Sequence, residues 1–313
     1  MPLSPSWWAV FGLTVLVLLA LDLGVFHRRP HAMTYSQALR ASLSWIAVAF
    51  LFNAGVWFWL GREKALEFLT GYLIEKALSV DNIFVFLVIF HFFQTPAELQ
   101  YRVLFWGVLG AIFMRGIFIF LGVVLLEKFH WVIYVFGAFL VLVGIKMLAH
   151  PRDTPHPERN AVFLLVRRVI PVIPRYHEGR FLVTVDGKRY ATMLLLTLAC
   201  VEATDLVFAI DSIPAIFAVT RDPFIVYTSN VFAILGLRAL YFLLQDAVGR
   251  FVYLKIGLGF ILSFVGVKML FSEVYPLPIG VSLSIVGGIL AVSLLASFLR
   301  TRGRALERLK PPR

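Results

Sequence analysis

Acidic side chains occur inside segments of this sequence that are otherwise long and apolar. Glu75 and Asp81 lie in one such segment, and Glu202, Asp205 and Asp211 lie in another. A carboxylate at the centre of a bilayer costs about 2.5–3.5 kcal/mol on insertion scales, so it is retained there for a function or a partner. These five acids are the first candidates for a functional site.

Helical spacing predicts a polar stripe in each of the two segments. At about 100° per residue, the stripes comprise Glu75, Ser79 and Asn82 in the first segment and Glu202, Asp205 and Ser212 in the second. Asp81 lies about 120° away from its stripe, and Asp211 also points elsewhere. Either the helices are interrupted, as Pro214 would allow in the second segment, or Asp81 and Asp211 face a different neighbour.

The polar groups on these segments form a hard, all-oxygen ligand set. Such a set suits Mn²⁺, Mg²⁺ or Ca²⁺ rather than Cu⁺ or Zn²⁺, and ligand type alone does not separate the first three. The candidate metal ligands are Glu75, Asp81, Asn82, Glu202, Asp205, Asp211 and Ser212. Carboxylates that release a cation can take up protons, so proton-coupled exchange is a hypothesis.

Two arginines, Arg115 and Arg238, lie near the centres of further apolar segments and are the expected charge partners of the acids. One interpretation is that they neutralise the acids as structural ion pairs. The other is that five acids against two arginines leave a net negative site, which a divalent cation would neutralise.

The composition indicates which elements position these residues. Of 313 residues, 60% are hydrophobic and only 15% are charged, and the mean hydropathy is +0.87. Soluble domains are less apolar and carry about 25% charged residues, so an all-α, polytopic membrane protein is expected. About nine transmembrane helices are predicted, at 7–26, 39–60, 66–92, 103–126, 131–148, 192–219, 224–245, 254–271 and 279–299.

The basic residues predict the orientation of these helices. With the N-terminus outside and the C-terminus in the cytoplasm, 19 Lys and Arg residues fall on inner segments and four on outer ones, which fits the positive-inside rule. The net charge of +11 therefore needs no nucleic-acid partner. Cys200 is the only cysteine, which excludes an internal disulfide and a cysteine-rich metal site.

The helices group into parts that are separated by one long basic loop. Residues 1–60 hold two N-terminal helices, 66–148 and 192–271 hold three each, 279–299 is the last helix, and 300–313 is a basic cytoplasmic tail. Within the cytoplasmic loop 149–191, residues 161–170 are expected to form a short helix and 181–191 a β-hairpin that turns at Asp186–Gly187.

The two groups of three helices resemble each other. Glu75 matches Asp205 and Asp81 matches Asp211 at an offset of 130 positions, Arg115 matches Arg238 at 123, and Lys146 matches Lys268 at 122. Because three spans is an odd number, the second copy enters the membrane from the opposite side. This predicts two inverted three-helix repeats, an arrangement of secondary transporters that places the site near the midplane.

Residues 192–244 closely resemble the TerC family of integral membrane proteins, as do the strings EKALSVDNIFVF at 75–86, LDLGVF at 21–26 and GVKML at 266–270. The resemblance covers most of the chain and is weakest at 149–180. It implies paired three-helix repeats, manganese efflux and a historical association with tellurite resistance. It also implies that the candidate ligands belong to the family's acidic motifs and that the chain resides in a bacterial cytoplasmic (inner) membrane.

The expected function is therefore export of a divalent metal cation, manganese by resemblance, with the lipid bilayer as the surroundings and protons as the hypothetical coupling ion. No cofactor is expected. An enzyme is not expected either, because no Gly-x-Ser-x-Gly or His-Glu-x-x-His motif and no mid-span histidine accompanies Ser79 or Ser212. Two alternatives stay open: an exporter of a small organic cation, and a membrane scaffold of a metal- or tellurite-resistance complex.

Overall fold

Helices make up nearly all of the described chain. The computed structural model describes residues 5–26, 34–129, 131–149, 172–173, 175–177, 179–185, 187–245, 253–272, 274–275 and 277–308. Long apolar segments form helices because a helix satisfies every backbone N–H and C=O within the segment, where lipid offers no hydrogen-bond partner. The expected short helix at 161–170 lies outside the described residues.

The helices coincide with the nine expected spans, with one difference. They are α1 (Pro5–Phe26), α2 (Tyr35–Leu60), α3 (Arg62–Phe92), α4 (Ala97–Lys128), α5 (Val132–Ala149), α7 (Met193–Phe217), α8 (Pro223–Leu235), α9 (Leu237–Leu244), α10 (Leu254–Leu270) and α11 (Ile279–Arg308). The expected single span at 224–245 is two helices, α8 and α9. They are separated by Gly236, whose φ of −85° and ψ of 0° depart from helical values.

Six of these helical stretches within the described residues are long and apolar enough to cross a membrane, counting Pro223–Leu244 as one. The other three expected spans are helices too, but they do not reach that length and apolarity. In α1 the apolar part that qualifies is Ser6–Ala20, α3 carries several charges, and α10 is 17 residues long.

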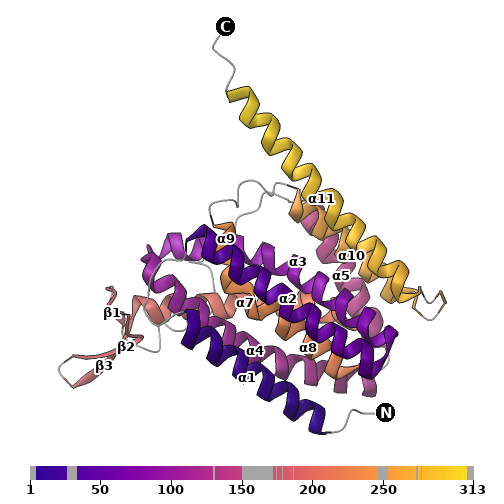
Figure 1. Ribbon diagram of the computed structural model, residues 1–313, viewed down its shortest axis with the longest axis horizontal. Helices are drawn as coiled ribbons and strands as arrows, with labels where there is room; N and C mark the ends of the chain where they lie inside the picture. The colour runs from indigo at the N-terminus through magenta and orange to yellow at the C-terminus, as the bar shows by residue number, and fades with distance from the viewer. Residues whose placement is uncertain are drawn as a thin grey trace.

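Four helices, α3, α4, α7 and α8, form the centre of the bundle and lie side by side in Figure 1. Helix α3 packs against α7 and α8, and α4 packs against the same two helices. Helix α2 covers α3 and α9, α1 lies against α8, and the long α11 crosses α10 and α3 at an angle to the bundle. Residues on the central four helices therefore meet inside the bundle.

Helices α5 and α10 pack antiparallel at very short range through glycines. A Cβ atom placed on Gly144 would lie 2.7 Å from the carbonyl oxygen of Gly259, and one placed on Gly266 would lie 2.7 Å from that of Gly137. Small residues allow helix backbones to approach closely in this way, which is how helices associate in lipid. Gly137 and Gly259, like Gly144 and Gly266, are 122 positions apart.

A small three-stranded sheet lies at the beginning of α7. Its strands β1 (Val172–Ile173), β2 (Leu182–Val185) and β3 (Lys188–Thr192) have the order β1-β3-β2. Strands β2 and β3 form an antiparallel hairpin in which Val185 pairs with Lys188, and Gly187 takes a φ of 74° in the turn. Strand β3 continues directly into α7 at Met193.

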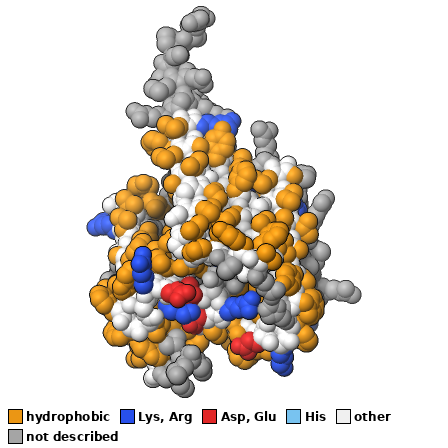
Figure 2. All heavy atoms as spheres, turned by 90° about the vertical axis from the view of Figure 1, so that its right-hand side faces the viewer, with side chains coloured by type: hydrophobic (Ala, Val, Ile, Leu, Met, Phe, Trp, Pro, Cys, Tyr) orange, Lys and Arg blue, Asp and Glu red, His pale blue; other side chains and the backbone are white. Residues whose placement is uncertain are grey.

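The surface of the bundle is apolar. Large hydrophobic side chains on α1, α2, α4, α5 and α11 are exposed, among them Leu13, Phe58, Phe113 and Leu295. Figure 2 shows hydrophobic side chains over most of the face in view, with acidic and basic side chains in a few places. Contact with lipid chains is favourable for such an apolar surface, whereas contact with water is unfavourable.

A candidate ion site at the centre of the bundle

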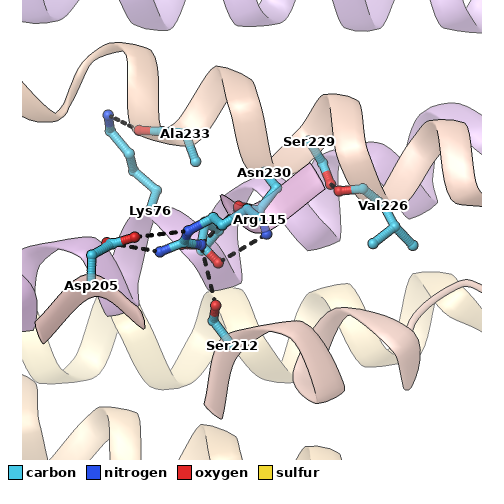
Figure 3. A network of polar contacts seen from close by, with 9 residues as sticks. Lys76, Arg115, Asp205, Ser212, Val226, Ser229, Asn230 and Ala233 are labelled. Carbon is cyan, nitrogen blue, oxygen red and sulfur yellow. Dashed lines mark hydrogen bonds and ion pairs between the residues drawn. The ribbon is translucent and has the colours of Figure 1, made fainter. Parts of the chain in front are cut away.

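The centre of the bundle holds a buried arginine between two acids. Arg115, on α4, is 1% exposed and forms ion pairs with Glu75 of α3 and Asp205 of α7. Its Nε and Nη2 atoms donate to the two carboxylate oxygens of Asp205, at 3.4 and 3.2 Å. Its Nη1 atom donates to Glu75 Oε1. The guanidinium therefore bridges two carboxylates that come from different helices. Figure 3 shows its contacts with Asp205 and Ser212.

Two neutral side chains complete the shell around Arg115. Its Nη1 atom also donates to Ser212 Oγ at 3.2 Å and to Asn230 Oδ1 at 2.7 Å. The amide of Asn230 donates in turn to Glu75 Oε2 at 3.4 Å. All four central helices thus contribute to one network, which we call the Arg115 network: Glu75, Arg115, Asp205, Ser212 and Asn230.

A second cation lies next to this network. Lys76 follows Glu75 on α3, and its Nζ atom donates to the carbonyl oxygen of Ala233 on α8 at 3.1 Å (Figure 3). That Nζ atom lies 2.9 Å from the place of a Cβ atom on Gly236, where α8 ends. The absence of a side chain at Gly236 therefore makes room for the ammonium group.

Glu202 lies on α7 one turn before Asp205 and faces Gly110 of α4. A Cβ atom on Gly110 would lie 2.0 Å from Glu202 Oε1 and 2.6 Å from Oε2. The Oε2 atom is buried and has no hydrogen-bond partner among the described residues. An unpaired polar atom away from water is unfavourable, so the Glu202 carboxyl is a group that an incoming cation or proton would stabilise.

A small hollow lies beside Asp205, next to the N-terminal half of α4. Its volume is about 10 Å³, which is close to the room that one water molecule needs. It is lined by Phe86, Leu104, Gly107, Val108, Ala111, Val201, Asp205 and Leu237. Gly107 is 123 positions before Asn230, so the hollow exists where one half of the chain has a glycine and the other has an asparagine.

Arg238, the counterpart of Arg115, lies away from the two acids of the Arg115 network. It is buried on α9, where it donates to the hydroxyl of Tyr101 on α4. Its guanidinium carbon is 4.3 Å from the centre of the Tyr101 ring and 5.7 Å from that of Phe105. These contacts are cation–π interactions, which stabilise a desolvated arginine.

The structure brings together three of the seven predicted ligands, Glu75, Asp205 and Ser212. Asn82 is buried two turns farther along α3, and the Asp81 side chain lies outside the described residues. Asp211 is half-buried, and the Lys146 ammonium of α5 is the charge that acts on it. Helices α3 and α7 are continuous, so the idea of an interruption is wrong, and Asp211 faces a different neighbour.

Sequence reasoning missed Asn230 and the two glycines that face α7, Gly107 and Gly110. Asn230 carried a usable signal, because it is an amide in the apolar stretch that also holds Arg238. Gly107 and Gly110 carried little signal in the sequence, because glycines are frequent in membrane helices.

No three His, Cys, Asp or Glu side chains among the described residues gather closely enough to hold a metal ion. The Arg115 network contains two carboxylates, Glu75 and Asp205, and the Arg115 guanidinium lies between them.

Comparison with known proteins identifies the family of this chain. The model of the integral membrane protein TerC family matches residues 60–305. An uncharacterised membrane protein of Myxococcus xanthus is 52% identical over 299 residues, covering 96% of this chain and 94% of that protein. A protein of Escherichia coli whose name describes a membrane-bound redox modulator, Alx, is 50% identical over 302 residues, covering 93% and 94%. No solved structure matches.

Proposed function

Because this chain belongs to the TerC family of integral membrane proteins, we propose that it is a transporter that exports a divalent metal cation, with manganese as the substrate. The observation that carries the proposal is the meeting of Glu75 and Asp205 around one cationic group in the middle of the bundle. The two acids occupy equivalent positions in the two halves of the chain, 130 positions apart.

The packing of α5 on α10 supports the inverted repeat that such a transporter needs. With an offset of 122 positions, Gly144 corresponds to Gly266 and Gly137 to Gly259. Gly144 approaches the counterpart of Gly137, and Gly137 approaches the counterpart of Gly144. A contact of this reciprocal kind is what a two-fold axis generates. A two-fold axis between antiparallel helices relates one three-helix group to the other in inverted topology.

The Arg115 network supports cation binding by its charge. If Arg115 withdraws, two buried carboxylates are left without their partner, which costs about 3–5 kcal/mol for a broken buried pair. A divalent cation that enters from the cytoplasm would restore the balance, and so would protons that enter from the other side. The same two acids therefore provide both export and exchange for protons.

Ligand chemistry favours a bare divalent ion over the alternatives. Two carboxylates, the Ser212 hydroxyl and the Asn230 carbonyl oxygen are hard oxygen ligands of the kind that Mn²⁺ and Mg²⁺ accept. The resemblance to the TerC family selects manganese. A hollow of about 10 Å³ leaves no room for the apolar body of an organic cation. A thiol–disulfide couple within the chain is excluded, because Cys200 is the only cysteine.

The test is manganese flux into liposomes that contain the purified chain, read from the quenching of a trapped fluorescent chelator. We expect the wild type to carry Mn²⁺, to respond to an imposed pH gradient, and to lose most of the flux in Glu75→Gln and in Asp205→Asn. Glu98→Gln is the matched control, because Glu98 is exposed in the first turn of α4.

Three outcomes would contradict parts of the proposal. A wild type that moves no Mn²⁺ would remove the manganese assignment. Flux that ignores the pH gradient would remove proton exchange. Normal flux in both acid variants would mean that the Arg115 network is a structural ion pair, as a scaffold protein would have.

A further inference from the structure

We propose that Arg115 and Arg238 are alternate occupants of the Glu75–Asp205 pair, each of which fills it in one of the two end states of transport. The inference rests on the proposed function, and it assigns to two arginines the task of holding the acid pair while no substrate is bound. It goes beyond a static ion pair, because it makes Arg238 a residue of the ion site although it lies elsewhere in this structure.

Equivalence of the two halves is the first step of the argument. Glu75 and Asp205 are counterparts, so a group that binds both lies at the axis that relates the halves. Arg115 reaches this place from α4. An operation that exchanges the halves leaves the acid pair in place and replaces Arg115 by Arg238. In inverted-repeat transporters the two halves take turns in this way around a fixed site.

The surroundings of Arg238 are the second step. It stacks on Tyr101 and Phe105 of α4, and its neighbour Leu237 lines the hollow that reaches Asp205. The hollow therefore lies between Leu237, the neighbour of Arg238, and Asp205, one acid of the pair. Because Gly107 provides no side chain there, the space that Asn230 fills in the other half is left open.

The break at Gly236 is the third step. Arg115 sits inside α4, a continuous helix of 32 residues, whereas Arg238 is the second residue of α9, a helix of eight residues that begins after Gly236. A short helix next to a glycine can rotate without moving α8. Hinge motions usually occur at such residues at the ends of helices. The close contact between α5 and α10 provides a fixed point for such a motion.

Energetics explain why two arginines serve better than one. Bare carboxylates in the middle of a membrane are costly, so a transporter whose site empties needs a cation to take the vacated place. One arginine on each half provides it in both end states. The substrate then binds in the interval when one arginine has left and the other has not arrived.

The experiment reads the two states without any metal. In a Cys200→Ala background, Leu104→Cys places a thiol at the hollow, and Tyr227→Cys places one at the equivalent position on α8, where the Tyr227 ring lies 3.3 Å from the site of a Cβ atom on Gly116. Labelling by a membrane-impermeant maleimide is measured in vesicles of both orientations. The observable is the ratio of labelling rates at the two thiols.

Opposite shifts are expected from the two arginine substitutions. Arg115→Gln removes the present occupant, so Arg238 moves to the acid pair and closes the space around position 104; labelling at position 104 falls and labelling at 227 rises, by roughly tenfold in the ratio. Arg238→Gln shifts the ratio the other way. Arg300→Gln, at an exposed arginine of α11, leaves it unchanged. Shifts in the same direction, or none, overturn the inference.

A second pair of variants tests the inference even if the two glutamine variants fail to fold. Arg115→Lys and Arg238→Lys keep the charge but lose the forked geometry, so they shift the ratio in the same opposite directions by less. An unchanged ratio in both overturns the inference. Manganese flux is measured separately. Opposite shifts without flux would leave the arginine exchange standing and remove the metal assignment, whereas flux without opposite shifts would do the reverse.

Discussion

Replacement of Gly144 by alanine tests the contact between α5 and α10 most directly. The new Cβ atom would lie 2.7 Å from both the carbonyl oxygen of Gly259 and the amide nitrogen of Ser263. These are backbone atoms, which cannot turn aside as a side chain does. Ordinary contacts are about 3.5–4.0 Å long, so the helices must separate by roughly 0.8 Å or more.

The size of the effect follows from two opposing terms. Overpacking of this kind costs about 1–3 kcal/mol, while alanine in place of glycine favours a helix by about 1 kcal/mol. Gly288→Ala on α11 isolates the second term, because a Cβ atom there meets nothing within 4 Å. We therefore expect Gly144→Ala to be less stable than Gly288→Ala by about 1–3 kcal/mol.

Gly266→Ala adds a stronger test, because its Cβ atom would lie 2.7 Å from Gly137 O and 2.8 Å from Val141 N, much as at Gly144. The two single variants should lose similar stability. The double variant should lose less than the sum, because one separation of the helices relieves both clashes. Equilibrium unfolding in detergent measures all four. Additive losses, or a Gly144→Ala variant as stable as Gly288→Ala, would refute the reciprocal contact.

Three further predictions concern the charged groups. Asp205→Asn should lower the free energy of unfolding by about 3–5 kcal/mol, because it breaks a buried pair, and Asp211→Asn by clearly less; equal losses in thermal unfolding would contradict the assignment of Asp205. Gly110→Ala should displace the Glu202 carboxyl, which lies 2.0 Å from the new Cβ atom, and lower Mn²⁺ flux in liposomes; unchanged flux would mean that this carboxyl has no part in transport. Lys64→Gln, which removes partly exposed ion pairs at 2.8 and 3.4 Å, should cost at most about 1 kcal/mol and nothing at high salt; a loss that salt leaves unchanged in denaturation would contradict this.

Sequence patterns predicted the helices well, because long apolar runs allow few other structures in lipid. The β2–β3 strand pair lies where alternation and the Asp186–Gly187 dipeptide indicated a hairpin. The break at Gly236 was missed, since a single glycine inside an apolar segment is compatible with a continuous helix. The Lys76 ammonium and the Trp45 side chain, which come from other helices, lie close to Gly236 and leave no room for a side chain there.

The site was predictable only in part. The offset between the halves identified Glu75 and Asp205, and helical spacing placed Asp211 on another face of its helix; the side chain of Asp81 lies outside the described residues. Spacing along one helix does not tell how far each helix is rotated against its neighbours. The central position of Arg115 and the contribution of Asn230 depend on those rotations, so they emerge only when four helices are packed together.

The glycine pairs of α5 and α10 also limit how the two halves can diverge. Each glycine faces the counterpart of the other, so enlargement at Gly144 in one half collides with Gly259 in the other half. A larger residue at either position forces the two helices apart, so the facing glycines are restricted together. Positions away from this contact carry no such restraint, and there the halves differ: Gly107 against Asn230, and Tyr72 against Glu202. The two segments can therefore differ elsewhere while the contact between α5 and α10 stays alike on both sides.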